Sequence, residues 1–238
     1  MTQSRENVAN GADAAGAHTF SDIYPDYSRS EVIADAVIHA IGIAVSIITF
    51  TTIYVYAFQS LSTPLNVALV IYGASVVSLF VLSASYHLTP FPASRPFLRL
   101  LDQSAIFFKI AGSYTPIVFM IDTAFGYIML ALIWSGAIMG AAGKLSSREM
   151  LDKHTVYIFL AMGWASVLLL WPIFQTLPTQ DAILIVLGGA VYSAGVIFHQ
   201  WDGLRFQNAI WHAFVLTASL LHLFAIADAA FAVGTVIQ

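Results

Sequence analysis

Seven long apolar stretches, separated by short breaks rich in turn-forming residues, dominate the pattern of this chain. A membrane-spanning helix needs roughly 20 mostly apolar residues, whereas a barrel strand is about half as long and alternates in polarity. The stretches have the length of helices and do not alternate. We therefore predict an all-α fold, a bundle of seven transmembrane helices over residues 33–57, 65–88, 103–121, 125–143, 155–175, 182–200 and 209–232.

The small number of charged side chains supports a membrane location. Of the 238 residues, 59% are hydrophobic and 9% are charged, whereas a soluble domain carries about 25% charged residues. So few polar side chains cannot cover a water-soluble globule, and we predict an integral membrane protein. The chain has no cysteine, which excludes disulfides, cysteine zinc sites and thiol catalysis. With no basic stripe and no glycine-rich phosphate loop, nothing indicates binding of nucleic acid, and membrane lipids are the expected partners.

The N-terminal region differs from the rest in composition. Residues 1–30 are polar, rich in Ala, Ser, Asp and Asn, and contain no apolar run. A cleavable signal peptide needs a basic start followed by an apolar stretch, and residues 1–30 do not have this pattern. We expect residues 1–30 to form a disordered tail and residues 31–238 to form a single membrane domain.

The basic residues predict the orientation of the bundle. When the two sides of the membrane are numbered by parity, eight of the nine Lys and Arg residues fall on the side of the N-terminus. The ninth, Lys109, lies inside the third span. Because cytoplasmic loops are enriched in Lys and Arg, we predict a multi-pass cell-membrane protein with a cytoplasmic N-terminus and an external C-terminus. The eight residues are Arg5, Arg29, Arg95, Arg99, Lys144, Arg148, Lys153 and Arg205.

Polar residues gather at the cytoplasmic ends of several spans. Ser83 and His87 end the second span, Asp102 begins the third, and Asn208 and His212 begin the seventh, one helical turn apart. Ionisable groups in a bilayer are costly and usually face the bundle interior or a water-filled cavity. We therefore predict that these residues form one buried polar site near the cytoplasmic face, with His87 and His212 as functional residues.

Other ionisable residues have simpler interpretations. Glu31, Asp35 and His39 share one face of the first span, and we expect Glu31 to cap or charge the helix start. For His39 and for His199, at the end of the sixth span, we expect contact with interfacial water or a supporting role. His222 lies about 15 Å further along the seventh span than the predicted site, and we expect it to be a hydrogen-bonded interior histidine.

A cluster of histidines with a carboxylate suits a metal centre. Catalytic zinc is commonly held by three protein ligands, often histidines, and a water. His87 and His212 are therefore candidate metal ligands, and Asp102 could orient the water or act as general base. The histidines lie on different spans, so their spacing along the chain does not by itself define the site.

Several segments carry a resemblance to a known family. They are Ser83-Ala-Ser-Tyr-His87, Leu101-Asp102, Ile110-Ala-Gly-Ser-Tyr-Thr-Pro116, Leu187-Gly-Gly-Ala-Val-Tyr192 and Ala209-Ile-Trp-His-Ala-Phe-Val215. They resemble the hemolysin III family, which belongs with the progestin and adipoQ receptors and, more distantly, the alkaline ceramidases. The resemblance covers residues 31–232 in order and implies seven helices with the N-terminus inside.

The resemblance also implies a zinc ion near the cytoplasmic face. The family's ligands are one histidine that ends the second helix and two histidines, spaced H-x-x-x-H, that begin the seventh. His87 and His212 match the first and the last of these. Ser83 and Asp102 match the family's accompanying serine and water-binding aspartate, and are our candidate catalytic residues.

Three positions depart from this family pattern, one of which is Gln103, the residue after Asp102, where the bacterial members often have histidine. Asn208 replaces the first histidine of H-x-x-x-H, and Lys109 stands where an apolar residue is usual. Asparagine is a far poorer zinc ligand than imidazole. One hypothesis is that the Lys109 ammonium, two turns from Asp102, replaces zinc beside that carboxylate. The other is that Lys109 extends toward the cytoplasm while zinc binds through His87, His212 and Asp102 or water.

Three classes of function follow. The first is a zinc-dependent hydrolase of a lipid amide or ester, in which the metal activates water. The second is a non-enzymatic protein that binds a lipid or senses and adjusts the state of the bilayer. The third is a pore-forming cytolysin, which the family's name implies.

Overall fold

The computed structural model describes residues 27–146, 154–201 and 203–234, and within these ranges it is helical, with no strand. The helices are α2 (Arg29–Ser60), α3 (Thr63–Leu88), α4 (Arg95–Ile121), α5 (Ala124–Ser146), α7 (Thr155–Trp164), α8 (Leu170–Thr176), α9 (Thr179–His199) and α10 (Gln207–Gly234). Two short 3₁₀ segments, η2 (Pro92–Ser94) and η3 (Ala165–Leu169), precede α4 and join α7 to α8. Seven helical stretches are long and apolar enough to cross a membrane. The predicted all-α, seven-span fold of a multi-pass membrane protein is confirmed.

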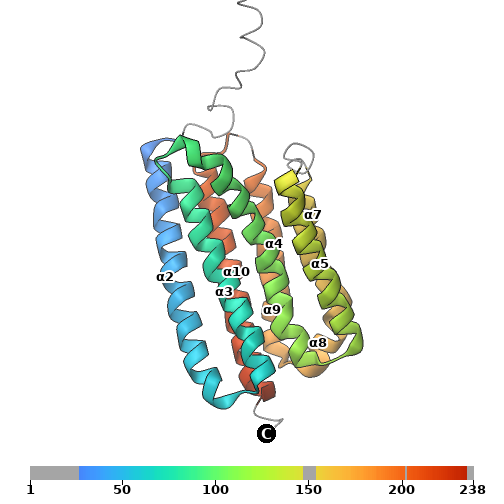
Figure 1. Ribbon diagram of the computed structural model, residues 1–238. Coiled ribbons are helices and arrows are strands. Elements are labelled where there is room, and N and C mark those ends of the chain that lie inside the picture. The colour runs from blue at the N-terminus through green and yellow to red at the C-terminus, as the bar shows by residue number, and fades with distance from the viewer. Residues whose placement is uncertain (1–26, 147–153, 202, 235–238) are drawn as a thin grey trace, which may run out of the picture.

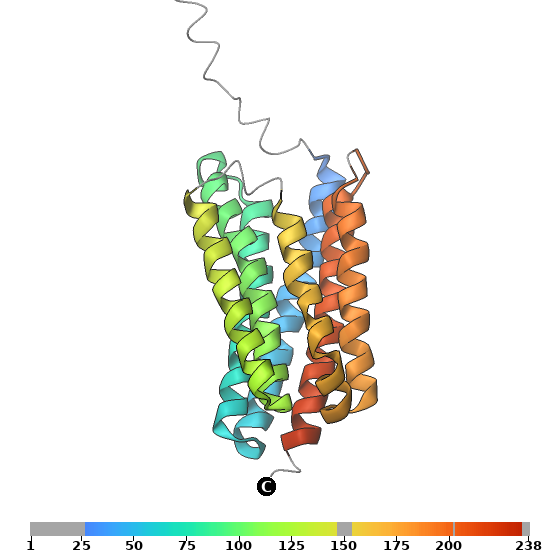
Figure 2. The same cartoon turned by 90° about the vertical axis from the view of Figure 1, so that its right-hand side faces the viewer.

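The helices stand side by side along one common direction (Figures 1 and 2). α3 packs between α2 and α4, α5 packs on the other side of α4, and α10 contacts α2, α4 and α9. The span that contains α4 is the most enclosed, with 72% of its most apolar 18-residue stretch buried inside the bundle. In the span formed by α7 and α8, the buried share of the corresponding stretch is only 17%. The span formed by α7 and α8 is therefore the most exposed of the seven on the outside of the bundle.

The fifth span is interrupted in the middle rather than continuous. Its 3₁₀ segment η3 changes the hydrogen-bonding pattern between α7 and α8. The hydroxyl of Tyr114 on α4 lies 2.8 Å from the carbonyl oxygen of Met162 and 3.0 Å from that of Gly163, and its single hydrogen is shared between these two acceptors. The indole nitrogen of Trp164 donates to the hydroxyl of Ser193 on α9 at 2.9 Å. Side chains from two neighbouring helices thus hold the interrupted span in place.

Candidate metal centre

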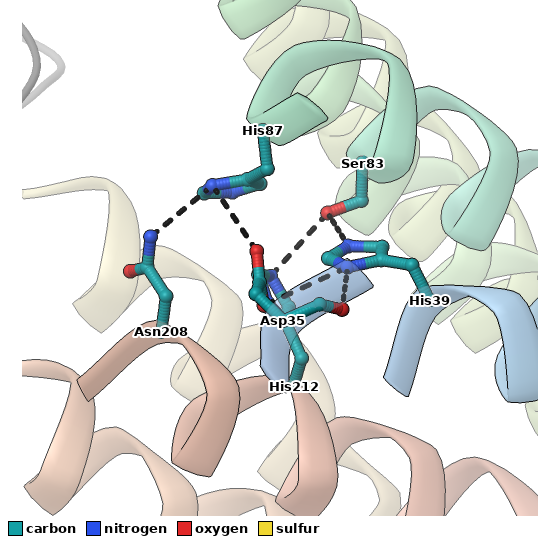
Figure 3. Close-up of polar contacts among 6 residues, drawn as sticks. All are labelled: Asp35, His39, Ser83, His87, Asn208 and His212. Atoms are coloured by element: carbon teal, nitrogen blue, oxygen red, sulfur yellow. Dashed lines mark hydrogen bonds and ion pairs between the residues drawn. The ribbon is translucent and has the colours of Figure 1, made fainter. Parts of the chain in front are cut away.

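A cluster of polar side chains from three helices lies at the end of the bundle where α2 begins (Figure 3). We call this end of the bundle the histidine end. The helices that supply the cluster are otherwise apolar, so their few polar residues converge in the interior. The cluster consists of Asp35 and His39 from α2, Ser83 and His87 from α3, and Asn208 and His212 from α10.

Asp35 orients two of the histidines. Its Oδ1 lies 2.6 Å from His212 Nδ1, and its backbone carbonyl accepts from His39 Nδ1 at 2.8 Å. Asp35, His39 and His212 are all buried, with 4%, 1% and 5% of their surfaces exposed. Because Nδ1 of each ring donates to Asp35, Nε2 of each neutral ring is left as an acceptor with a free lone pair.

The two lone pairs converge on one hydroxyl. Ser83 Oγ lies 3.2 Å from His39 Nε2 and 3.4 Å from His212 Nε2. A hydroxyl has a single hydrogen and can donate to only one of them. Two imidazole nitrogens that face the same point, each held by a carboxylate or carbonyl on the other ring nitrogen, form the arrangement that metal-binding histidines usually have.

His87 completes the ring of imidazoles. Its Nδ1 accepts from the side-chain amide of Asn208 at 3.2 Å and lies 3.9 Å from Asp35 Oδ2. Its ring centroid is 4.7 Å from that of His212 and 5.8 Å from that of His39. Three histidines from three helices are therefore in mutual contact, although only two of them were predicted to be functional.

A cavity of about 440 Å³ opens beside the cluster. At the histidine end its lining includes Ser83, His87, Asp102 and His212. The carboxylate of Asp102 interacts with Ser83 and with His212. Further into the bundle the lining is mainly aliphatic and aromatic, and comes from α4, α7, α8, α9 and α10. The structure thus brings all four predicted site residues to one end of a mostly apolar cavity.

The donor atoms suit a metal ion. One ligand atom each from Asp35, His39 and His212 lie within 4.8 Å of one another in a buried group. Imidazole nitrogen and carboxylate oxygen are ligands that zinc takes in proteins. The group could therefore hold a metal ion.

Comparison with known proteins places this architecture in a family. A sequence model described as "Haemolysin-III related" matches residues 28–223. The chain belongs to the hemolysin III family. It is 33% identical to "Hemolysin-3" of Bacillus cereus over 197 residues, which cover 82% of this chain and 90% of that protein. It is 31% identical to "Hemolysin-3 homolog" of Bacillus subtilis over 201 residues, covering 84% and 94% of the two chains. It is also 30% identical to "Monocyte to macrophage differentiation factor" of Homo sapiens over 165 residues, covering 66% and 67%.

Within this hemolysin III protein, Asn208 occupies the position that our reading of the family motif gives to a histidine. The amide does not face Asp35 but donates to His87 Nδ1. It therefore occupies a lone pair of His87, a predicted metal ligand. Asp35 and His39, on the facing helix, bring a carboxylate and a third imidazole to the same place.

The structure corrects the expectation for His39 and extends that for Glu31. His39 is 1% exposed and lies at the centre of the cluster, so contact with interfacial water is wrong for it. Glu31 forms the predicted cap, a capping box with Ser28. Its Oε1 also accepts from the backbone N–H of Phe206 at 2.9 Å, which ties the start of α2 to the segment before α10. His199 lines the cavity and packs against Trp211, with ring centroids 4.8 Å apart.

Tyr27 lies two residues before the start of α2. It lines the cavity together with His87 and Asn208. Burial, and secondly the carboxylate of Asp35, raise the pKa of the Tyr27 phenol above its ordinary value. At neutral pH the phenol is therefore an uncharged donor and adds no negative charge to the site.

Asp35 and His39 are the site residues that the sequence interpretation did not select. The signal was present, because the two lie four residues apart near the start of a membrane span, a spacing that places them on one helix face. Only the packing of α2 against α3 and α10 shows that this face meets Ser83, His87 and His212.

Proposed function

We propose that this protein is a metal-dependent hydrolase of an ester or amide in a membrane lipid. The observation that carries the proposal is the convergence of His39 Nε2 and His212 Nε2 on Ser83 Oγ, because Ser83 and His212 line one end of a mostly apolar cavity. An acyl chain suits such a lining, and the polar cluster is where a carbonyl would meet the donor atoms. From the distribution of basic residues, we further propose that the histidine end faces the cytoplasm of a cell membrane.

Each side chain has a distinct part in this proposal. His39, His87 and His212 would supply nitrogen ligands, with Asp35 as a carboxylate that ligates or orients the rings. Zinc bound there would acidify a water and polarise the lipid carbonyl. Asp102, which lines the cavity beside Ser83, would accept the proton of that water and pass it to the leaving alcohol or amine. Ser83 would hold the water or the carbonyl oxygen through its hydroxyl.

Turnover of defined lipids tests the proposal. Purified protein in nanodiscs, loaded with zinc, is given a ceramide or a phospholipid, and release of the acyl chain is measured. We expect Asp102→Asn to lower the rate by about 10²- to 10⁴-fold, the range for loss of a general base, while zinc content stays unchanged. No release above the level of His212→Ala on either lipid would contradict the hydrolase.

A second candidate is a non-enzymatic lipid-binding protein. The observation in its favour is that the cluster is closed by its own hydrogen bonds, with Asn208 bound to His87 and Asp35 bound to His212. Each of the six cluster members lies within hydrogen-bond distance of another member. Deleting the gene and measuring acyl-chain composition and membrane fluidity under cold stress tests this role, and no change would count against it.

A further inference from the structure

Lys109 lies deep in the cavity, away from the cluster that the proposed hydrolysis uses. It is on α4, seven residues after Asp102, which places it about 10 Å further into the bundle along the helix. It is 4% exposed and lines the cavity. The placement of Lys109 is wrong in both hypotheses drawn from the sequence, whereas the binding of zinc stays a prediction. Lys109 does not extend toward water, and within the described ranges no carboxylate oxygen lies within the 4.0 Å ion-pair distance of its Nζ.

The ammonium has little compensation from the protein. Its Nζ lies over the ring of Tyr192, 4.1 Å from the centroid. The hydroxyl of Tyr192 lies 2.6 Å from Ser219 Oγ, with which it forms a hydrogen bond, and Lys109 forms no hydrogen bond within the described part of the chain. A ring face offsets only part of the cost of burying a cation, and an ammonium has three hydrogens to donate.

His222 gives this region a second polar feature. Its Nε2 donates to the carbonyl of Ile185 at 3.0 Å, as expected for a hydrogen-bonded interior histidine. Nδ1 of the neutral ring is then an acceptor, and it has no partner among the described residues. Gly188 makes space for the ring, because a Cβ there would lie 2.3 Å from His222 Cδ2. Lys109 and His222 thus form a polar pocket inside an apolar lining.

We propose that this pocket binds the head of a single-chain amphiphile that carries one carboxylate. The carboxylate pairs with the Lys109 ammonium, and the hydrocarbon chain lies along the apolar part of the lining. That part includes Leu79, Ile106, Ile117, Phe159, Ile173 and Val215. One negative charge matches the Lys109 ammonium, and Arg99, the other basic residue of the lining, lies ten residues earlier on α4. A phosphodiester head would bring further polar atoms next to the apolar side chains around Lys109.

This site does not depend on the proposed hydrolysis. The carboxylate binds about 10 Å deeper than Asp102, and no residue of the histidine cluster is needed to hold it. Failure of zinc binding or of lipid turnover would leave the Lys109 pocket unaffected. A variant that loses metal, His212→Ala, should therefore keep its affinity for the carboxylate ligand.

Binding of palmitate to the full-length protein tests the proposal. Delipidated protein in phosphatidylcholine nanodiscs is titrated with radiolabelled palmitate and, separately, with its methyl ester. Lys109→Met keeps the length of the side chain and removes its charge. We expect this variant to bind palmitate at least about tenfold more weakly, the size of one charge-assisted hydrogen bond. We expect the methyl ester to bind wild type and variant equally.

Other outcomes would overturn the proposal. They are equal palmitate affinity of Lys109→Met and wild type, wild-type binding of the ester as tight as that of the acid, or stronger competition by lysophosphatidylglycerol than by unlabelled palmitate. Gly189→Leu gives an independent test if Lys109→Met does not fold. Gly189 lines the cavity, and a Cβ there would meet no atom within 4 Å, so a leucine can enter the space. This variant should lose palmitate binding, and unchanged binding would also overturn the proposal.

Discussion

The two polar regions of the cavity differ in how far their side chains bind one another. At the histidine end, carboxylate, amide, hydroxyl and three imidazoles bind one another across α2, α3 and α10. Around Lys109, the buried ammonium contacts the face of the Tyr192 ring, and His222 Nδ1 has no hydrogen-bond partner among the described residues. A closed network stabilises the fold without a ligand, whereas an open one costs free energy until a ligand arrives. Replacing a polar side chain by an apolar one should therefore lower the free energy of unfolding at the histidine end and raise it around Lys109.

The largest expected effect is at the histidine end. His212→Ala removes the partner 2.6 Å from Asp35 and leaves the buried carboxylate with the longer contacts to His39 at 3.6 Å and His87 at 3.9 Å. We expect a loss of about 3–5 kcal/mol in the free energy of unfolding. The measurement is reversible unfolding in mixed micelles, with His154→Ala as the matched control, because His154 is exposed and lies outside the cluster.

A double variant sharpens this prediction. Asp35→Asn combined with His212→Ala should cost clearly less than the sum of the two single changes, because either one alone already breaks the pair. Strict additivity would mean that the 2.6 Å contact does not contribute to stability.

The Lys109 region should respond with the opposite sign. In delipidated protein, Lys109→Met removes a buried charge that no described carboxylate neutralises. We expect the variant to be more stable than wild type by about 1–4 kcal/mol, the range seen when well-packed apolar side chains replace buried ionic groups. The same unfolding assay applies. A variant that is less stable than wild type would contradict the contrast between the two regions.

Asn208→His should change metal affinity more than stability. It places an imidazole where our reading of the family motif has one and removes the amide donor from His87 Nδ1. We expect zinc affinity, measured by competition with a chelator, to rise on the order of tenfold, a common size for changes around a metal centre. Asn208→Ala, which frees His87 without adding a ligand, is the control and should give a smaller change.

The smallest expected effect lies outside both regions. Ser28 caps α2, and its hydroxyl accepts from the backbone N–H of Glu31. Ser28→Ala should cost about 1 kcal/mol, the usual size of a lost N-cap. Zinc content and palmitate affinity should remain at wild-type level, which would separate general loss of stability from effects on either site.

The sequence predicted the architecture more fully than the site. Long apolar runs identify membrane helices directly, because each span has to satisfy its own backbone in lipid. Ser83, His87, Asp102 and His212 were also recognised, and they line one end of the cavity. Asp35 and His39 were left aside, since the spacing of residues on one helix defines a shared face but not the helix that this face meets.

Lys109 is a second residue whose surroundings could not be predicted from its spacing on one helix. Its spacing from Asp102 suggested a pair on one face of α4, but its ammonium lies over the ring of Tyr192 on α9. Which groups surround a buried cation depends on how α4, α9 and α10 pack, and the interrupted fifth span beside them is part of that packing. No pattern within a single helix encodes the cavity that these helices enclose.

The most direct test of the metal centre is the zinc content of the purified full-length protein after incubation with zinc and removal of free metal. We predict about one zinc ion per chain in wild type and in His154→Ala, as for a single catalytic-type site. We predict far less in His212→Ala and in His39→Ala. Absence of zinc from wild type, or equal zinc in wild type and both cluster variants, would contradict a metal centre at the histidine end.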